Sequence, residues 1–458
     1  MNFNNIHNVY LLGIGGIGMS ALAKYFKLKG CNVAGYDRTQ SALCDELSQA
    51  GINIHYSDDI SLIPKEFTTT FKEHILIIFT PAIPQNHREF IWFKENNFTV
   101  KKRAEVLGEI TLNSYTIAVA GTHGKTTIST CLAHIYNQLE NGCNAFLGGI
   151  SKNYHTNFPY AENGNITIVE ADEYDRSFLQ LLPSSAIVTA VDADHLDIYN
   201  NYQNVVDAFT QFAQKVKENG KLLIKKESKF NPKPVNANVA TYSVKENADC
   251  TISDLQLYNG KFTFNLHTPW GNIEKLTPGI TGMFNVENVA AAASMCIWEG
   301  IDFNKIKSGI ETFLGVKRRF DVQAVTTNSI YIDDYAHHPE ELKAFISSVR
   351  GVYPKKQITG IFQPHLYTRT RDFADGFGEA LSLLDKLILL DIYPARELPI
   401  QNITSKTILE KVKIKDKTIC TISQLFKIIK KQKPELLLTM GAGDIAQLVE
   451  PLKNIILS

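Results

Sequence analysis

Short apolar runs alternate with amphipathic, helix-like stretches along most of the chain. In the first part the apolar runs cover residues 9–12, 32–36, 74–80 and 98–101, and a helix is expected up to Lys29. Strands of this length that alternate with helices are typical of a parallel sheet. We therefore predict that residues 1–107 form a doubly wound, Rossmann-like domain.

The middle part repeats this pattern and then changes it. Apolar runs at 116–120, 165–169 and 186–191 predict strands, and apolar positions at helical spacing predict a helix from about Thr127. Between Lys221 and Thr277, alternating runs predict strands at 221–224, 240–244, 251–257 and 261–266, which we interpret as an antiparallel flank. Residues 108–316 are thus expected to form a central domain with a mixed sheet.

The last part returns to the first pattern. Strands are predicted at 330–332, 357–362, 386–391 and 436–440, and Pro339 is expected to open a helix. The preceding segment Gly315–Asp321 is interpreted as a hinge. The predicted fold class is α/β with three domains, of which the third, residues 317–458, is again Rossmann-like.

Composition narrows the class of protein. With 44% hydrophobic and 21% charged residues, the 458-residue chain resembles an ordinary globular protein, and its formal net charge of zero gives no support for a nucleic-acid or membrane partner. The seven cysteines include no C-x-x-C pair, so reduced thiols are expected rather than a disulfide frame or zinc site. Because the N-terminus lacks a basic leader region and no apolar run approaches about 18 residues, we expect a cytoplasmic protein.

The turn after the 116–120 strand reads Gly121-Thr122-His123-Gly124-Lys125-Thr126-Thr127. Glycines let backbone N–H groups close around anionic oxygens, and the following helix N-terminus adds partial positive charge. Lys125 can reach the outer phosphates, and a Thr hydroxyl can bind Mg²⁺. We therefore predict a P-loop-type nucleoside triphosphate site, shorter than the usual loop because Val119 stands where that pattern has glycine.

A second glycine-rich turn follows the first strand. It contains Gly13, Gly15, Gly16 and Gly18, and the acidic Asp37 ends the next strand about twenty positions on. This spacing is typical of a dinucleotide site. An NAD-dependent oxidoreductase therefore stays open as an alternative function, as does a turn that serves only close helix packing.

Carboxylates crowd the ends of two predicted central strands. The first strand is followed by Glu170, Asp172, Glu173 and Asp175, and the second by Asp192, Asp194 and His195. Crowded carboxylates repel one another unless a cation lies among them, and Mg²⁺ needs only one or two protein carboxylates beside phosphate oxygens. We predict a Mg²⁺ site here, with His195 as a candidate ligand of a second divalent ion, whereas a solvated acidic turn is the alternative.

Polar residues also gather at strand-to-helix turns of the last part. Tyr335 and His337 follow the 330–332 strand, and Arg369 follows the 357–362 strand. Such turns are typical places for a site, and arginine can hold a carboxylate or phosphate with two hydrogen bonds. We expect contact with substrate rather than with metal. Asn288, at the start of an alanine-rich helix, is a candidate for nucleotide contact or for a simple cap.

Seven motifs occur in a fixed order over nearly the whole chain, namely GIGGIGMSALA, GTHGKTT, EADEYDRSF, DADHLDIY, GVKRRFD, DDYAHHPEEL and FQPHLYTRTRDF. Together they resemble the Mur ligase family. The resemblance implies an ATP-dependent ligase of cytoplasmic peptidoglycan synthesis, which joins L-alanine to the lactyl carboxylate of UDP-N-acetylmuramate through an acyl phosphate. It also implies that the N-terminal domain binds the UDP-sugar, the central domain ATP and the C-terminal domain the amino acid.

The resemblance further assigns roles to single residues. It implies that Lys125, Glu170 and His195 are catalytic and that Thr126, Glu170 and His195 bind metal. For ATP, the resemblance adds Asn288, Arg319 and Asp334 to residues 121–127. For the amino acid, it indicates Tyr335, His337 and Arg369. For the UDP-sugar, it indicates the turn from Gly13 to Gly18 together with Asp37. A monomer or homodimer is expected. A recycling ligase that joins a whole peptide to the same sugar nucleotide stays open as a rival.

Overall fold

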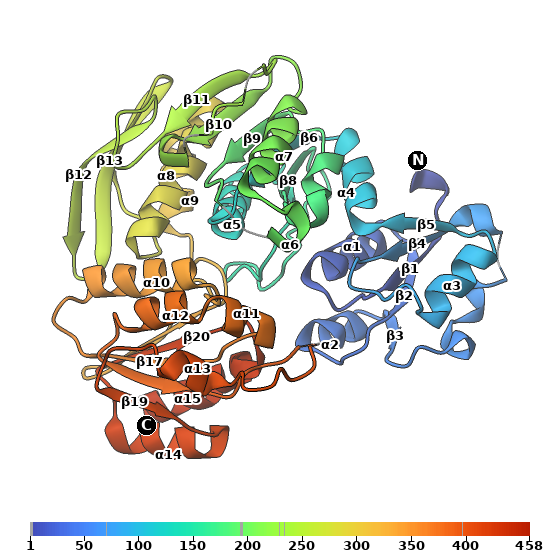
Figure 1. Cartoon of the computed structure of the whole chain (residues 1–458). Helices are drawn as coiled ribbons and strands as arrows, with labels where there is room; N and C mark the ends of the chain where they lie inside the picture. The colour runs from blue at the N-terminus through green and yellow to red at the C-terminus, as the bar shows by residue number, and fades with distance from the viewer. Residues whose placement is uncertain (1–2, 70, 193–195, 229, 233, 396) are drawn as a thin grey trace. The chain divides into compact units, whose positions relative to one another are not determined.

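The computed structural model of the chain describes residues 3–69, 71–192, 196–228, 230–232, 234–395 and 397–458. The chain divides into two compact units. The first unit comprises Met1–Leu255, Thr263–Gly279 and Glu287–Leu314, and the second comprises Gln256–Phe262, Ile280–Val286 and Gly315–Ser458. Figure 1 labels the helices and strands of both units.

The N-terminal sheet has five parallel strands in the order β3-β2-β1-β4-β5. Its strands are β1 (Asn8–Leu12), β2 (Asn32–Tyr36), β3 (Asn53–His55), β4 (Ile75–Phe79) and β5 (Thr99–Lys102). Its helices are α1 (Ile17–Leu28), α2 (Ala42–Gln49), α3 (Arg88–Glu95) and α4 (Arg103–Leu112). The predicted doubly wound arrangement is confirmed.

The central sheet has six parallel strands in the order β11-β10-β9-β6-β8-β7. Its strands are β6 (Tyr115–Ala120), β7 (Asn144–Phe146), β8 (Ile166–Glu170), β9 (Ser185–Val188), β10 (Lys221–Lys225) and β11 (Asn238–Tyr242). The helices of this part are α5 (Lys125–Tyr136), α6 (Leu196–Tyr199), α7 (Tyr202–Gln214), α8 (Met283–Trp298) and α9 (Phe303–Glu311), with a 3-10 helix, η5 (Tyr174–Gln180), after β8.

The expected antiparallel flank is only partly correct. Strands β10 and β11 extend the central sheet in parallel, because the helix α7 connects β9 to β10 and brings the chain back in the same direction. The antiparallel strands form a separate three-stranded sheet of β12 (Thr251–Tyr258), β13 (Lys261–Thr268) and β14 (Gly271–Leu276). The central sheet itself is therefore not mixed.

The C-terminal sheet has six strands in the order β15-β16-β20-β17-β18-β19, and only the pair β15 and β16 is antiparallel. The strands are β15 (Asp321–Val325), β16 (Ile330–Asp334), β17 (Ile358–Phe362), β18 (Lys386–Leu389), β19 (Asp416–Ile419) and β20 (Leu436–Met440). The helices are α10 (Pro339–Val352), α11 (Tyr367–Asp372), α12 (Ala374–Leu381), α13 (Ser405–Leu409), α14 (Ile422–Gln432) and α15 (Val449–Leu457). The predicted α/β fold class, with a sheet in each of three regions, is confirmed.

One apolar core runs from the N-terminal sheet into the central sheet. It includes Leu22 of α1, Val106 of α4, Ala118 of β6 and Phe178 of η5, all of them buried. Burying one such large side chain stabilises a fold by about 1.5 to 3 kcal/mol. This shared core explains why both sheets belong to one compact unit. In the described part of the chain, no helix is long and apolar enough to cross a membrane.

Candidate active site

The turn between β6 and α5 has the backbone that a phosphate loop requires. Gly121 and Gly124 have φ angles of 133° and 86°, which favour glycine. A Cβ atom on Gly121 would lie 1.9 Å from Oγ1 of Thr189, and one on Gly124 would lie 2.5 Å from Oδ1 of Asn288. The predicted helix start at Thr127 is two residues late, because the left-handed Gly124 lets α5 begin at Lys125. The strand, turn and helix are thus confirmed in order.

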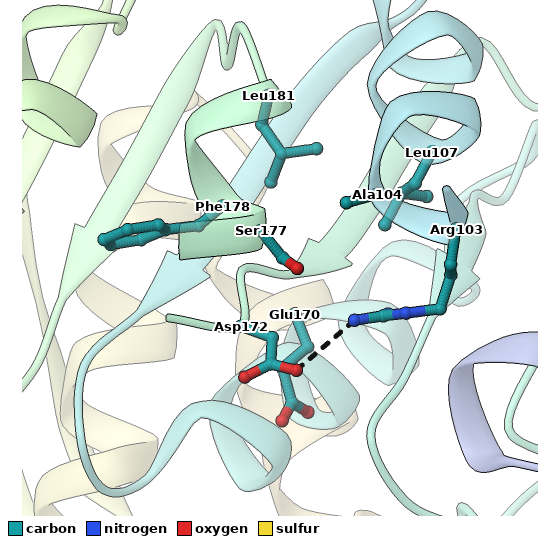
Figure 2. Close-up of a pocket in the computed structure, with 8 residues that line it drawn as sticks. All are labelled: Arg103, Ala104, Leu107, Glu170, Asp172, Ser177, Phe178 and Leu181. Carbon is teal, nitrogen blue, oxygen red and sulfur yellow. Dashed lines mark hydrogen bonds and ion pairs between the residues drawn. The ribbon is translucent and has the colours of Figure 1, made fainter. Parts of the chain in front are cut away.

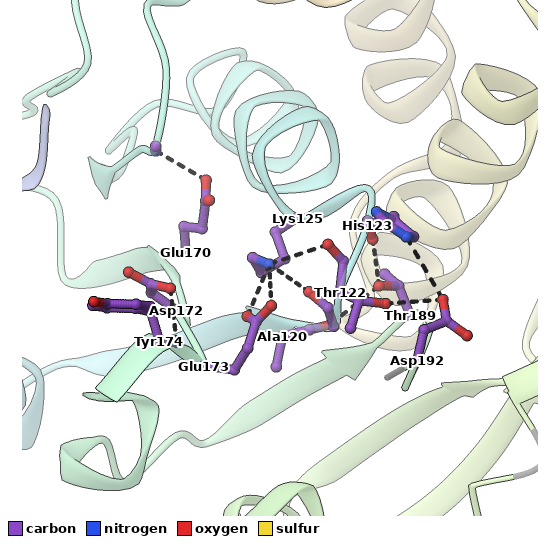
Figure 3. A network of polar contacts seen from close by, with 12 residues as sticks. Ala120, Thr122, His123, Lys125, Glu170, Asp172, Glu173, Tyr174, Thr189 and Asp192 are labelled. Carbon is purple, nitrogen blue, oxygen red and sulfur yellow. Dashed lines mark hydrogen bonds and ion pairs between the residues drawn. The ribbon is translucent and has the colours of Figure 1, made fainter. Parts of the chain in front are cut away.

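Lys125 is held inside this turn by acceptors from two strand ends. Its Nζ donates to the backbone oxygen of Gly121 at 2.5 Å and to Oε1 of Glu173 at 2.9 Å. The other carboxylate oxygen of Glu173 lies 2.8 Å from Nζ, and the side chains of Lys125 and Glu173 are 13% and 2% exposed. Figure 3 shows the lysine directed at this carboxylate. Sequence reasoning included Glu173 in the acidic cluster but did not predict this pairing.

The carboxylates around Lys125 dominate its electrostatics. Burial alone would lower the pKa of the ammonium group, but Glu173, Glu170 and Asp172 together raise that pKa above its ordinary value. Burial raises the pKa of Glu173, and the ammonium of Lys125 opposes that shift. The site therefore keeps its lysine charged. A charged lysine at a helix N-terminus suits a polyanionic ligand.

Glu170, a predicted metal ligand, ends β8 and accepts a hydrogen bond from the backbone N–H of Gly148 at 2.9 Å. Thr126 and Thr127 are buried in the first turn of α5. Among the described residues, no group of three or more His, Cys, Asp or Glu side chains is placed to hold a metal. The carboxylate of Glu170 and the hydroxyl of Thr126 are oxygen donors of the kind that Mg²⁺ takes, and the Mg²⁺ site stays a prediction. His195 lies outside the described residues.

Thr122 and His123 face the end of β9. Oγ1 of Thr122 donates to a carboxylate oxygen of Asp192 at 3.1 Å, and Nε2 of His123 lies 3.7 Å from the same oxygen. Thr189 donates to the backbone oxygen of His123 at 2.5 Å. These contacts fix the loop between two parallel strands (Figure 3).

The N-terminal glycine turn is hydrogen-bonded to the carboxylate of Asp37. The N–H of Gly15 donates to Oδ2 of Asp37 at 2.8 Å, and Gly13 has a φ angle of 86°. A Cβ on Gly18 would lie 2.6 Å from Nη1 of Arg103, so the arginine packs directly against the turn. The structure thus brings the predicted residues Gly13, Gly15, Gly18 and Asp37 together. It adds Arg103, which the sequence analysis did not single out.

Arg103 also reaches the central sheet. Its Nη2 lies 3.3 Å from Oδ2 of Asp172, and both side chains are partly exposed. Figure 2 shows this ion pair in a pocket between α4 and η5. The lining residues of the pocket are Arg103, Ala104, Leu107, Glu170, Asp172, Ser177, Phe178 and Leu181. One cation therefore contacts both the glycine turn and the acidic strand end of the first compact unit.

The second compact unit gathers the predicted C-terminal residues around Tyr335. The guanidinium of Arg319 lies 5.3 Å from the Tyr335 ring, and the ring of His337 lies 5.1 Å from it. Burial lowers the pKa of His337; Glu341 opposes this shift, whereas Arg369 and Arg319 add to it. The charges of both arginines thus act on His337, and two guanidinium groups near one imidazole suit an anionic ligand.

Asp334 ends β16 and organises the turn that follows it. Its carboxylate accepts the backbone N–H groups of Phe320 at 2.7 Å and Ala336 at 2.8 Å. Burial raises its pKa to about 7, although Arg319 opposes the shift. All five predicted residues of this unit, Arg319, Asp334, Tyr335, His337 and Arg369, are therefore linked by contacts or by their charges.

A parallel sheet with a glycine–lysine–threonine turn at its carboxyl edge defines a P-loop-type α/β protein. Three family models match the chain: "Mur ligase family, catalytic domain" over residues 8–115, "Mur ligase middle domain" over 119–296 and "Mur ligase, glutamate ligase domain" over 318–443. The chain belongs to the Mur ligase family.

Individual relatives agree with the family models. The UDP-N-acetylmuramate–L-alanine ligase of Parabacteroides distasonis is 46% identical over 457 residues, which cover 100% of this chain and 98% of that protein. The crystal structure of the UDP-N-acetylmuramate–alanine ligase of Thermotoga maritima superposes with a TM-score of 0.80 and 24% identity, covering 98% of both chains. A murein peptide ligase from Psychrobacter arcticus gives a TM-score of 0.72 and 19% identity, again covering 98% of both. The fold is thus shared, whereas the high sequence identity is with an alanine ligase.

Proposed function

We propose that this chain is an ATP-dependent ligase that joins L-alanine to the lactyl carboxylate of UDP-N-acetylmuramate, releasing ADP and phosphate. The single observation that carries the proposal is the 46% identity with a UDP-N-acetylmuramate–L-alanine ligase over the full chain. The buried lysine of the phosphate loop supports it, because a ligase of this type must hold a triphosphate. An NAD-dependent oxidoreductase is not favoured, because the chain belongs to a family of ligases.

The chemistry requires an activated carboxylate. A carboxylate does not condense with an amine in water, because its negative charge repels nucleophiles and hydroxide leaves poorly. Transfer of the γ-phosphoryl group gives an acyl phosphate, and the amine of alanine then displaces phosphate through a tetrahedral intermediate. Lys125 and the backbone N–H groups of residues 121–127 are proposed to hold the triphosphate and stabilise the charge that develops on it.

Mg²⁺ is proposed to be held by Thr126 and Glu170, with His195 at a second ion. Such an ion neutralises phosphate charge during transfer. In the first unit Asn288, whose amide lies against Gly124, is proposed to contact ATP. In the second unit Arg319 and Asp334 are proposed to bind ATP, and Tyr335, His337 and Arg369 to orient alanine and its carboxylate.

The N-terminal turn is proposed to bind the UDP diphosphate through Gly13, Gly15, Gly16 and Gly18, with Asp37 beside them. We propose domain boundaries at residues 1–107, 108–316 and 317–458 for the UDP-sugar, ATP and amino-acid domains. The protein is proposed to act in the cytoplasm, where its nucleotide substrates are made, as a monomer or homodimer.

The decisive test is phosphate release in the presence of UDP-N-acetylmuramate, ATP and Mg²⁺, with a panel of amine acceptors. We expect L-alanine to support turnover, and omission of any one substrate to stop it. Turnover with a tripeptide but not with L-alanine would instead identify the recycling ligase. Reduction of NAD without ATP consumption would reject both ligase assignments.

A further inference from the structure

Among the described acids at the central strand ends, Glu173 is the most deeply buried. Its carboxylate is 2% exposed and both of its oxygens lie within 2.9 Å of Nζ of Lys125. The hydroxyl of Tyr199 donates to the backbone oxygen of Glu173 at 2.6 Å, which fixes the residue at the start of η5. By contrast, Asp172 is 39% exposed and pairs with Arg103. Within the acidic cluster, Glu173 is thus directed at the lysine of the phosphate loop.

The donors of Lys125 limit what it can bind at one time. An ammonium group has three N–H donors, and its acceptors in this structure are Glu173, the backbone oxygen of Gly121 and, at 3.5 Å, that of Thr122. A phosphate oxygen that accepts from Nζ must therefore share or displace one of them. Glu173 is the only charged acceptor of the three. An incoming phosphate consequently competes with this carboxylate for the same cation.

We propose that Glu173 is a positioning residue that holds the Lys125 ammonium group in place and that nucleotide phosphate has to displace. The inference rests on the proposed function, because it assumes a nucleotide at this loop. The arrangement avoids an unpaired buried cation between turnovers. It also lowers nucleotide affinity, because part of the interaction of Lys125 with phosphate replaces an existing ion pair, and weaker binding favours release of ADP.

The test is the binding of nucleotide to Glu173→Gln, which keeps the shape of the side chain and removes its charge. By isothermal titration we expect ADP and a nonhydrolysable ATP analogue to bind roughly tenfold more tightly than to the wild type, both with Mg²⁺ and with chelator. The nucleotide-free variant should melt at a lower temperature, because its buried lysine has lost its counter-ion. In steady-state assays the KM for ATP should fall while the KM for L-alanine stays unchanged.

The chain offers a matched control in Glu299. This acid pairs with Lys221 at 2.9 Å, and the side chains of Glu299 and Lys221 are 9% and 23% exposed. Lys221 begins β10, at the amino ends of the parallel strands, whereas Lys125 follows the carboxyl end of β6. Glu299→Gln should lower the melting temperature and leave nucleotide affinity unchanged. In a Lys125→Met background, Glu173→Gln should no longer tighten nucleotide binding, because there is no cation to compete for.

Several outcomes would overturn the inference. Unchanged affinity in Glu173→Gln would show that the pair does not compete with phosphate, and weaker affinity confined to Mg²⁺ buffers would make Glu173 a metal ligand instead. If Glu173→Gln does not fold, Glu173→Asp gives the same test, because withdrawing the carboxylate by one methylene should tighten binding to a smaller degree. Failure of the wild type to bind nucleotide at all would reject the proposed function and, with it, this inference, whereas the outcomes above reject the inference alone.

Discussion

The two glycine-rich turns of the first compact unit share a backbone plan and differ in charge. Each follows a buried parallel strand, contains a glycine with positive φ and opens a helix, α1 in one case and α5 in the other. The central turn contains Lys125, which is paired with Glu173. The N-terminal turn has no cation of its own, and its Gly15 N–H is taken by Asp37. The same backbone device is thus adapted to different ligands by the side chains around it.

This difference in charge matches the different charges of the two proposed ligands. A triphosphate carries more charge than the diphosphate of a nucleotide sugar, and the turn proposed to bind it has a lysine within the loop. The N-terminal turn relies on backbone N–H groups and on Arg103, which packs against Gly18 from the start of α4. Substituting Lys125 and Arg103 therefore tests whether the two turns differ in the way proposed.

The largest effect is expected for Lys125→Ala. Removing the only cation of residues 121–127 should reduce phosphate release by roughly a thousandfold or more, because the transferred phosphoryl group loses its charge stabilisation. Binding of UDP-N-acetylmuramate, measured by calorimetry, should persist, because the proposed sugar-nucleotide turn is a separate structure. Lys221→Met removes a mostly buried lysine at the amino end of β10 and should leave phosphate release intact. Loss of sugar-nucleotide binding in Lys125→Ala would contradict the separation of the two turns.

A smaller effect is expected for Arg103→Met, which keeps the length of the side chain and removes its charge. We expect kcat/KM to fall about ten- to hundredfold, with a raised KM for UDP-N-acetylmuramate, because the cation that contacts both the N-terminal glycine turn and Asp172 is lost. Lys102→Met is the matched control, since Lys102 pairs with Asp175 at 3.4 Å on the exposed surface. Equal effects of the two substitutions on steady-state kinetics would mean that the position of Arg103 is unimportant.

The sequence predicted the two turns because their signals are local. Glycines that precede a helix, with a lysine at its first position, determine the backbone and the charge within a few residues. The helix start was two residues off, since the left-handed conformation of Gly124 depends on its close approach to Asn288 in α8. Parallel pairing of β10 and β11 was missed because α7, which reverses the chain between β9 and β10, was not predicted.

The pairing of Glu173 with Lys125 was out of reach for a different reason. Four carboxylates lie within six positions at the end of β8, and their sequence spacing does not say which one is buried. The choice depends on η5, where Asp175 and Arg176 adopt left-handed φ angles of 51° and 54° that turn the chain sharply. Arg103 was similarly hidden, because its two neighbours, Gly18 and Asp172, are distant in sequence.

Asp37→Asn should have a moderate effect confined to the N-terminal turn. The hydrogen bond from Gly15 N–H to a charged oxygen becomes one to a neutral amide oxygen, so the turn is less firmly held. We expect UDP-N-acetylmuramate to bind roughly tenfold more weakly by calorimetry, with nucleotide affinity unchanged. Asp45→Asn, at an exposed acid of α2, should change neither affinity. Stronger sugar-nucleotide binding in Asp37→Asn would instead mean that Asp37 competes with the diphosphate.

The smallest effect on activity is expected for a second buried acid, Glu89, which differs from Glu173 in having no lysine partner. It is fully buried in α3, accepts a hydrogen bond from the hydroxyl of Tyr10 at 2.7 Å, and burial raises its pKa from 4.5 to about 7. His55 lies 3.6 Å away, but burial lowers the pKa of that imidazole, which leaves it largely neutral near pH 7. Because Glu89 has no lysine partner and is not in the phosphate loop, we expect its titration to change the free energy of unfolding with pH and not nucleotide binding.

The sign follows from proton uptake. Between about pH 4.5 and pH 7 the folded protein binds the Glu89 proton more tightly than the unfolded chain, so the free energy of unfolding falls as pH rises through this window. Glu89→Gln removes the titration, so its stability relative to the wild type should rise by roughly 3 kcal/mol between about pH 4.5 and about pH 8. Melting of both proteins at the two pH values measures this difference, and Glu46→Gln, which changes a carboxylate that is 43% exposed, should show none of it. A difference between Glu89→Gln and wild type that is the same at both pH values would show that Glu89 is already ionised in the folded protein at the lower pH.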